Sequence, residues 1–146
     1  MNIAVITGAS SGMGREFVLQ LDALHKYDEI WLIARRKERL EELKGTVRAE
    51  IRPIPLDLSK KKSFDEFEKL LKEHNPKIRT LVNASGFGKF GKFTDIPLSA
   101  QCNMIDLNVK ALMSMTYLCL KYMPQNSEIF QLCSLSSFQP VPYINV

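Results

Sequence analysis

The sequence predicts an α/β fold in which a doubly wound parallel sheet carries helices on both faces. Short apolar segments alternate with segments of helical periodicity over the whole chain of 146 residues, and such alternation builds βαβ units with right-handed crossovers. Several of the apolar segments are nearly continuous, which is typical of strands that are covered on both faces. We therefore expect a single domain over residues 1–146.

The first half of the chain alternates strand and helix. Asn2–Ile6 is an apolar run and predicts a strand, and the helix expected over Gly14–Leu24 has Phe17, Val18 and Leu21 on one face. Further apolar runs predict the next strands, and a charged segment predicts the helix between them. These elements are, in order, a strand at Glu29–Ala34, a helix at Lys37–Lys44 and a strand at Ala49–Pro55.

The second half continues this alternation. Ser59 is a good N-cap residue and predicts the start of a helix that ends near His74, before Pro76. The remaining elements are a strand at Thr80–Asn83, a loop rich in glycine and phenylalanine at Gly86–Phe93, a long helix from Pro97–Leu98 to the residue before Pro124, and a strand at Glu128–Cys133. The long helix is apolar on most sides. We expect one face to cover the sheet and the other to need a second partner, either a further helix or another subunit.

The stretch from Thr7 to Gly14, directly after the first strand, is the strongest functional signal. Gly8 can adopt backbone angles closed to other residues, and glycine at positions 12 and 14 removes side chains where a ligand and the following helix approach the strand. The N–H groups that open the helix, together with its positive dipole end, attract a phosphate. The spacing alone is also compatible with an ordinary glycine turn. The expected contacts come from Gly8, Ser10, Ser11, Gly12, Met13 and Gly14.

Composition and charge disfavour several classes of partner. The net charge is +4 and the basic residues are spread out, without the basic stripe and aromatic platforms of a nucleic-acid-binding surface. Three cysteines without a C-x-x-C pair indicate reduced thiols, and the isolated His25 and His74 predict no metal site. The sequence has neither a recognisable signal peptide nor a membrane-spanning run, so we expect a cytoplasmic protein with no nucleic-acid or membrane partner.

Motifs at the ends of the expected strands resemble the short-chain dehydrogenase/reductase family along the whole chain. The stretch Thr7–Gly14 is similar to that family's T-G-x-x-x-G-x-G loop. Asp57 and Leu58 match its D-[LV] pair, whose acidic side chain fixes the adenine end of the coenzyme. The segment Asn83-Ala84-Ser85-Gly86 resembles N-N-A-G, with alanine for the second asparagine and serine for the alanine. The resemblance implies a Rossmann-like sheet with the strand order 3-2-1-4-5 and a coenzyme lying across the carboxyl ends of its strands.

Two further residues match the family's catalytic positions. Asn108 corresponds to its helix asparagine, which would hold a proton-relay water, and Ser134 to its serine, which would hydrogen-bond the substrate oxygen. Considered singly, these polar residues also have simpler interpretations. Asp57 is suited to the positive end of a helix, Asn83 to bonding the loop backbone, and Ser134 to an ordinary strand end. Their common register favours the functional interpretation.

The end of the second strand indicates which coenzyme is bound. Ala34 is followed there by Arg35 and Arg36, where an NAD-specific enzyme would place Asp or Glu for the ribose hydroxyls. Guanidinium groups pair with a 2′-phosphate, whereas a carboxylate would repel it. A charge-assisted hydrogen bond contributes roughly 1.5–3 kcal/mol. We therefore expect NADP(H), the other interpretation being that the two arginines only open a charged helix.

The family's chemistry further implies a Tyr-x-x-x-Lys pair after the serine, in which the tyrosine donates a proton. Alignment with the family's S-x-x-G-x-x-P-x-P-x-x-x-x-Y places this tyrosine at the first position beyond Val146, so we expect a C-terminally truncated domain. Tyr117 and Lys121 have the right spacing but precede Ser134, and we expect the tyrosine to pack and the lysine to reach solvent. We expect Tyr143 to lie beside the loop 87–93.

The sequence therefore favours an NADP(H)-dependent oxidoreductase that transfers hydride between nicotinamide and a small-molecule carbonyl or alcohol. We expect this chain alone to be inactive, because it lacks the tyrosine that acts as general acid. We also expect it to form homo-oligomers, because its fifth strand is an exposed edge and its long helix has an uncovered apolar face. The alternative is a non-catalytic NADP(H)-binding module or fragment. A methyltransferase with a similar glycine turn is disfavoured by Arg35 and Arg36, which stand where an acidic ribose contact is expected.

Overall fold

The computed structural model describes residues 1–24, 26–139 and 141–144. The expectations for His25 and for the chain end at Val146, and the position of Pro140 in the family alignment, lie outside this range. The strands are β1 (Asn2–Thr7), β2 (Glu29–Ala34), β3 (Glu50–Pro55), β4 (Lys77–Asn83) and β5 (Glu128–Gln131). The helical elements are α1 (Gly12–Ala23), α2 (Lys37–Glu41), α3 (Lys61–His74), α4 (Leu98–Ile105), the π-helical turn η1 (Asp106–Lys110), α5 (Ala111–Leu120) and the 3₁₀ turn η2 (Leu135–Ser137).

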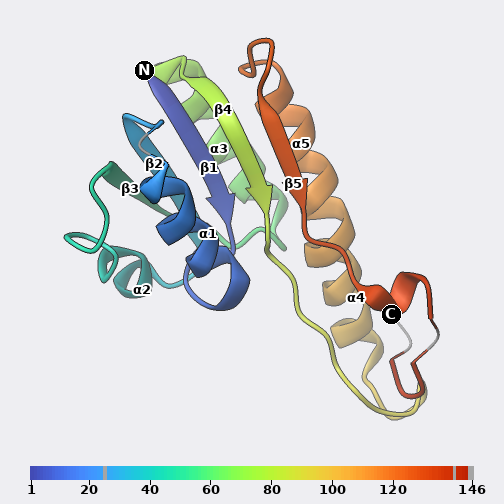
Figure 1. Ribbon diagram of the computed structural model, residues 1–146. Coiled ribbons are helices and arrows are strands. Elements are labelled where there is room, and N and C mark those ends of the chain that lie inside the picture. Colours follow the sequence, from blue (N-terminus) through green and yellow to red (C-terminus); the bar gives the residue numbers. More distant parts are fainter. Residues whose placement is uncertain (25, 140, 145–146) are drawn as a thin grey trace.

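The strands form one parallel sheet in the order β3-β2-β1-β4-β5 (Figure 1). This confirms the predicted α/β class and strand order. β1 and β4 are paired up to their carboxyl ends, but the connection after β1 leads toward β2 and the one after β4 leads toward β5. The loops that follow these two central strands therefore run apart and open a crevice at that edge.

Alternate residues of β1 face opposite sides of the sheet. Ile3 and Val5 pack in a core with Phe67 of α3 and Met115 of α5. On the other side, the even-numbered residues Ala4 and Ile6 pack with Val18 of α1 and Leu40 of α2. The sheet is thus the middle of three layers, with α1 and α2 in front of it and α3 and α5 behind it in Figure 1.

The start of α3 differs from the prediction. Lys60, and not Ser59, is the N-cap residue, and its side chain makes no capping hydrogen bond. Ser59 turns back instead, donating from its N–H and its Oγ to Asp57 Oδ1 at 3.0 and 2.7 Å. Prediction of Ser59 as the cap was wrong because the nearby carboxylate is the stronger acceptor for both donors.

The predicted long helix is divided in the structure. A π-helical turn, η1, separates α4 from α5, and its i→i+5 bond runs from the Ala111 N–H to the Asp106 carbonyl. A π-helical turn inserts one extra residue per turn, so the side chains on either side of it change face. The apolar pattern continues across the turn, which is why the sequence predicts one helix.

One face of α5 covers the sheet, as expected, through buried Ala111, Met115 and Cys119. The opposite face carries apolar side chains that the described residues leave in solvent, among them Met113 at 62% exposure and Tyr117 at 64%. The expectation that Tyr117 packs was therefore wrong. The Lys121 ammonium lies over its ring, 5.1 Å from the centroid.

Candidate functional site

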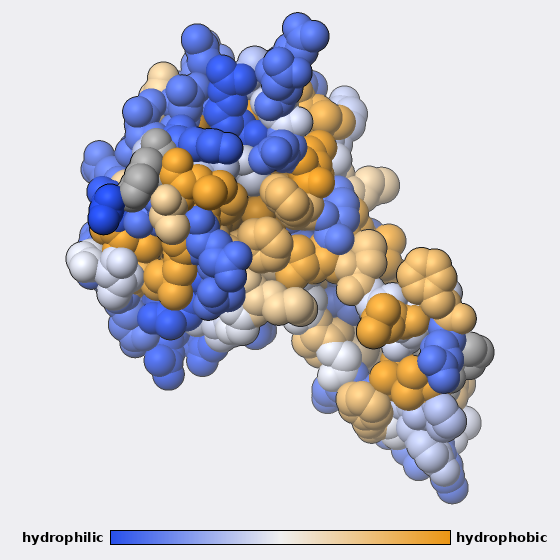
Figure 2. Space-filling view, in the orientation of Figure 1, coloured by the Kyte–Doolittle hydropathy of each residue, from blue (hydrophilic) through white to orange (hydrophobic). Residues whose placement is uncertain are grey.

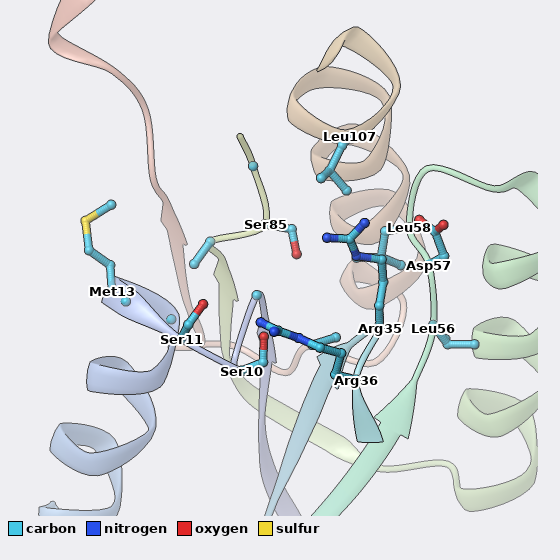
Figure 3. A pocket seen from close by; sticks show the side chains of 16 residues that line it. Ser10, Ser11, Met13, Arg35, Arg36, Leu56, Asp57, Leu58, Ser85 and Leu107 are labelled. Carbon is cyan, nitrogen blue, oxygen red and sulfur yellow. The ribbon is translucent and has the colours of Figure 1, made fainter. Parts of the chain in front are cut away.

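A crevice of about 310 Å³ opens at the carboxyl ends of β1, β2, β3 and β4. The loops after β1, β2 and β3 meet there with the turn after β4 (Figure 3). Thirteen of the sequence-predicted coenzyme residues line it, namely Gly8, Ser10, Ser11, Gly12, Met13, Gly14, Arg35, Arg36, Asp57, Leu58, Ala84, Ser85 and Gly86. Segments far apart in the sequence are thus brought together at one edge of the sheet.

The glycines of the first loop are required by its geometry. Gly8 and Gly12 have φ of +69° and +54°, a region that favours glycine. A Cβ at position 14 would lie 2.4 Å from the Gly8 carbonyl oxygen, so only glycine lets α1 approach the strand this closely. Above Gly12 there is open space within 4 Å. The loop is therefore a tight turn with an open side, as a phosphate requires.

The start of α1 has backbone donors available for an anion. Its first helical bond joins the Arg15 N–H to the Ser11 carbonyl at 3.3 Å, so the N–H groups of residues 12–14 precede the helical ladder. The N-cap residue Ser11 makes no side-chain capping bond, and the first turn holds no acidic residue. These donors and the positive helix end therefore face the crevice without a competing acceptor from the cap.

Thr7, at the end of β1, ties this loop to the turn after β4. Its buried Oγ1 accepts hydrogen bonds from the Ala84 N–H at 3.0 Å and the Ser85 N–H at 3.1 Å. A Cβ on Gly8 would lie 2.7 Å from the Ala84 carbonyl oxygen. The two loops therefore pack backbone against backbone and form a common floor.

The two arginines enter the crevice in different directions. In Figure 3 the Arg36 side chain extends back toward Ser10, whereas that of Arg35 extends toward Leu107. Ser10 and Arg36 together offer a hydroxyl and a guanidinium to one anionic group. Arg35 instead lies beside Asp57 and Leu58, where the flat face of its guanidinium could stack on a planar ring.

Asp57 is held as a carboxylate at the end of β3. Partial burial opposes ionisation, but the side-chain and backbone hydrogen bonds from Ser59, and then the charges of Arg35 and Lys60, lower the pKa of Asp57 below its ordinary value. The carboxylate therefore remains an acceptor at neutral pH.

Asn83 lies outside the crevice lining. It is buried, and its Nδ2 donates to Thr116 Oγ1 at 3.1 Å and to Gln131 Oε1 at 2.9 Å. The simpler interpretation, a side chain that bonds the loop backbone, is wrong, because these hydrogen bonds go to the side chains of α5 and β5.

Asn108 and Ser134 line a second hollow of about 610 Å³, which shares Ser85 and Gly86 with the crevice. Its apolar lining comes from Phe87, Leu112, Leu132 and Ile144, and its polar lining includes Ser136 and Ser137. The two predicted catalytic residues are thus brought together directly beside the predicted coenzyme residues.

The Asn108 amide holds the loop after β4. Its Oδ1 accepts from the Phe87 N–H at 3.0 Å and its Nδ2 donates to the Phe87 carbonyl at 2.9 Å. Each end of the amide retains one further hydrogen-bonding position, because an amide has two N–H groups and two acceptor lone pairs. Asn108 can therefore fix the loop and still bind a water.

Ser134 lies just beyond β5 as the N-cap of η2. Its Oγ accepts from the Ser136 N–H at 3.1 Å, which leaves the hydroxyl proton free to donate. Tyr143 lies beside the loop 87–93, as expected, because its carbonyl accepts from the Gly91 N–H at 3.0 Å.

Sequence reasoning missed Leu56 and Leu107, which supply apolar walls of the crevice. Both adjoin motif residues, Asp57 and Asn108, and this adjacency was the available signal. In the described part of the chain, no group of three or more His, Cys, Asp and Glu is placed to hold a metal ion. Nor does any helix found there have the length and apolar character needed to cross a membrane.

Comparison with known proteins agrees with this arrangement. Residues 2–146 match the family described as short chain dehydrogenase. The chain belongs to this family. One relative, an uncharacterised oxidoreductase of Staphylococcus epidermidis, is 30% identical over 140 residues, which are 94% of this chain and 60% of that protein. The chain thus spans about three fifths of the length of that curated relative.

Solved structures show the same fold. An alcohol dehydrogenase from the archaeon Thermococcus sibiricus, complexed with 5-hydroxy-NADP, superposes with a TM-score of 0.83 at 27% identity, covering 98% of this chain and 62% of that one. A metagenomic short-chain oxidoreductase in complex with NADP superposes with a TM-score of 0.85 at 25% identity, covering 98% and 66%. This short-chain dehydrogenase chain therefore has oxidoreductase relatives, some of them solved with NADP-type coenzymes.

Proposed function

We propose that this short-chain dehydrogenase chain binds NADP(H) in the crevice and serves hydride transfer between nicotinamide and a carbonyl or alcohol. The observation that carries the proposal is the convergence of an open glycine turn and two guanidinium groups on one hollow. The solved NADP complexes of similar chains support the same coenzyme.

The residues present fit this coenzyme. The free N–H groups before the α1 ladder suit the pyrophosphate, and the open space above Gly12 gives it room. Ser10 and Arg36 would hold the 2′-phosphate, Arg35 would cover one face of the adenine, and Asp57 would accept from its amino group. Bound there, NADPH would supply a hydride to a carbonyl carbon.

The hollow beside the crevice would hold the substrate. Ser134 would donate its free hydroxyl proton to the substrate oxygen, and Asn108 would use its remaining N–H or lone pair to hold a relay water. Phe87 and Leu112 would exclude bulk water on either side.

Titration of the purified chain with NADPH and NADH tests this proposal. NADPH should bind at least about tenfold more tightly, because a charge-assisted pair contributes roughly 1.5–3 kcal/mol. Arg36→Asp should abolish the preference and Arg35→Asp should reduce it. Arg39→Gln, which changes an exposed arginine of α2 paired with Glu42, is the matched control and should leave it intact. Equal affinities for the two coenzymes would contradict the proposal.

We propose in addition that a polypeptide of residues 1–146 alone does not turn over substrate. A polypeptide of these residues contains no Tyr-x-x-x-Lys pair after Ser134, and Tyr117 lies on the exposed face of α5. Loss of a positioned general acid lowers rates by roughly 10²–10⁴. Ketone-dependent oxidation of NADPH by this polypeptide would contradict the proposal.

A further inference from the structure

A set of hydrogen bonds joins Asn83, Thr116 and Gln131, which line neither hollow; Asn83 directly precedes the lining residue Ala84, and Gln131 directly precedes Leu132. Thr116 Oγ1 is the centre of this set: it donates to the Leu112 carbonyl at 2.7 Å and accepts from Asn83 Nδ2 at 3.1 Å and Gln131 Nε2 at 3.0 Å. One donor and two lone pairs are all that a hydroxyl has. The group is therefore fully used, and three elements, β4, β5 and α5, meet at it.

Asn83 and Gln131 close the network between the two strands. The second N–H of Asn83 Nδ2 donates to Gln131 Oε1 at 2.9 Å, and the two residues are register partners in the β4–β5 pair. Asn83 Oδ1 is buried without a partner among the described residues. An unpaired buried acceptor costs roughly 1–3 kcal/mol, so this arrangement is not the most stable way to fill the space.

The network lies at the point where β4 and β5 end, which suggests why the sequence keeps a polar network there. Among the described residues, β5 has a strand neighbour on its β4 side only, and all four of its residues are exposed, so packing holds it weakly. The Leu132 N–H bonds the Asn83 carbonyl at 3.1 Å just where β5 ends, and Ser134 follows two residues later. On the β4 side, Ala84 and Ser85 continue from Asn83 into the crevice.

We propose that Thr116 and Gln131 are positioning residues, which with Asn83 clamp the end of β5 and thereby fix Ser134 relative to the coenzyme loop. The role of Ser134 rests on the proposed function. The clamp depends on the directionality of hydrogen bonds. Apolar side chains could fill the same space without an unpaired acceptor, but they would allow β5 to slide or tilt. Three hydrogen bonds at one hydroxyl instead define a single arrangement.

Site-resolved amide hydrogen exchange on the 146-residue chain tests the clamp without any ligand. Thr116→Val removes the hydroxyl with little change of shape, and Thr116→Ser restores it. We expect Thr116→Val to raise the exchange rate of the Leu132 amide about tenfold, as loss of a typical net hydrogen bond would, and Thr116→Ser to return it toward the original rate. The Leu56 amide, which bonds Ala34 in the distant β2–β3 pair, should change little.

Thr80→Val is the matched control. Thr80 is a buried threonine in the middle of β4 whose hydroxyl also has a partner, Tyr27 OH at 2.6 Å, but this bond involves neither Asn83 nor the end of β5. Thr80→Val should leave the exchange rate of the Leu132 amide unchanged even if it lowers the overall stability. A rise shared equally by Leu132 and Leu56 in Thr116→Val, or no rise at Leu132, would overturn the proposal. If Thr116→Val does not fold, Gln131→Met at the exposed strand end removes two bonds of the same network, those to Asn83 and to Thr116, and should give the same local rise.

A second measurement separates this inference from the proposed function. In the unaltered chain, NADPH should shift the amide resonances of Cys133 and Ser134. In Thr116→Val the dissociation constant for NADPH should stay within about threefold, because the crevice is intact, while these shifts diminish; full-sized shifts would overturn the clamp. Failure of the unaltered chain to bind NADPH would reject the proposed function, and the exchange rates would still decide whether the clamp exists.

Discussion

At the scale of single residues, Thr7 links two loops of the crevice through one buried hydroxyl. One hydroxyl oxygen accepts two backbone N–H groups, those of Ala84 and Ser85, in a fully buried position. The same contact sets the floor of the crevice, so the residue contributes both to stability and to the proposed coenzyme site.

Thr7→Val should therefore lower the free energy of unfolding by about 2 kcal/mol, since two buried donors lose their acceptor. NADPH affinity should fall with it, because the turn after β4 loses its anchor. Urea unfolding and coenzyme titration measure the two effects. Thr7→Ser retains the hydroxyl and is the control; a loss in Thr7→Ser as large as that in Thr7→Val would contradict the role given to the two hydrogen bonds.

Asp57 gives a prediction for pH. Its pKa is lowered in the folded chain by Ser59, Arg35 and Lys60, against the effect of partial burial, so the folded state binds the proton less tightly than the unfolded state. The stabilisation is complete above the unfolded pKa of about 4 and is lost as the pH falls through the lower folded value. The stability difference between the unaltered chain and Asp57→Asn should thus shrink between about pH 6 and pH 3. Unfolding curves at both pH values measure this difference, and Asp65→Asn, which changes an exposed carboxylate of α3, is the control. A difference that does not depend on pH would contradict the assignment.

At the scale of elements, the sequence predicts the strands better than the helices. The near-continuous apolar runs of β1 and β2 fix both their position and their burial, and the order of the sheet follows from the family resemblance. The π-helical turn η1 could not be predicted, because the apolar spacing of residues 104–115 fits one continuous helix equally well. The prediction of Ser59 as the N-cap was wrong for a related reason. N-cap preference is a local property, and the Ser59 side chain bonds the Asp57 carboxylate instead.

The same limit applies to the site. Residues of the glycine turn were predictable because their backbone geometry leaves few alternatives, as Gly14 shows by its contact with Gly8. Asn83 was not, because its partners Thr116 and Gln131 come from elements far along the chain. Contacts of this kind depend on register and helix rotation, which a single sequence does not determine.

The η1 turn carries the element-scale prediction. Through Asn108 it makes two hydrogen bonds to the Phe87 backbone and so restrains the loop that contains Lys89 and Lys92. Asn108→Ala should free this loop and speed trypsin cleavage after those lysines about tenfold, with only a modest change in the melting temperature. Mass spectrometry of the early fragments identifies the sites. Asn103→Ala, on the preceding helix α4, is the matched control, and equal rates in both variants would contradict this role.

At the scale of the whole molecule, the two edges of the sheet differ in chemistry. The Leu56 N–H bonds Ala34, and successive N–H groups of a strand point to opposite edges, so the outward positions of β3 include Pro53 and Pro55. These have no N–H to offer a further strand. On β5 the corresponding outward positions, Ile129 and Gln131, keep their donors. One edge is therefore protected against pairing and the other is open.

The apolar surface gathers on the open side. Figure 2 shows hydrophobic side chains spread from the middle of the molecule to the narrow lobe that contains the C-terminal segment in Figure 1. Phe130 of β5 is 38% exposed beside Phe17, and Met113, Tyr117 and Leu120 stand out from α5. An open strand edge and an apolar helix face on one side together favour contact with further polypeptide.

We therefore predict that a polypeptide of these 146 residues self-associates through β5 and α5. Sedimentation velocity should show species larger than one chain, with a population that grows with concentration. The double variant Met113→Lys and Leu120→Lys places charges on the exposed α5 face and should shift the chain toward monomer, because burying unpaired charges costs several kcal/mol. Lysine at exposed Leu24 and Leu98, outside this face, provides the control. A monodisperse monomer for the unaltered chain would contradict the prediction, as would equal dissociation by both double variants, since the contact would then depend on overall charge and not on this side of the molecule.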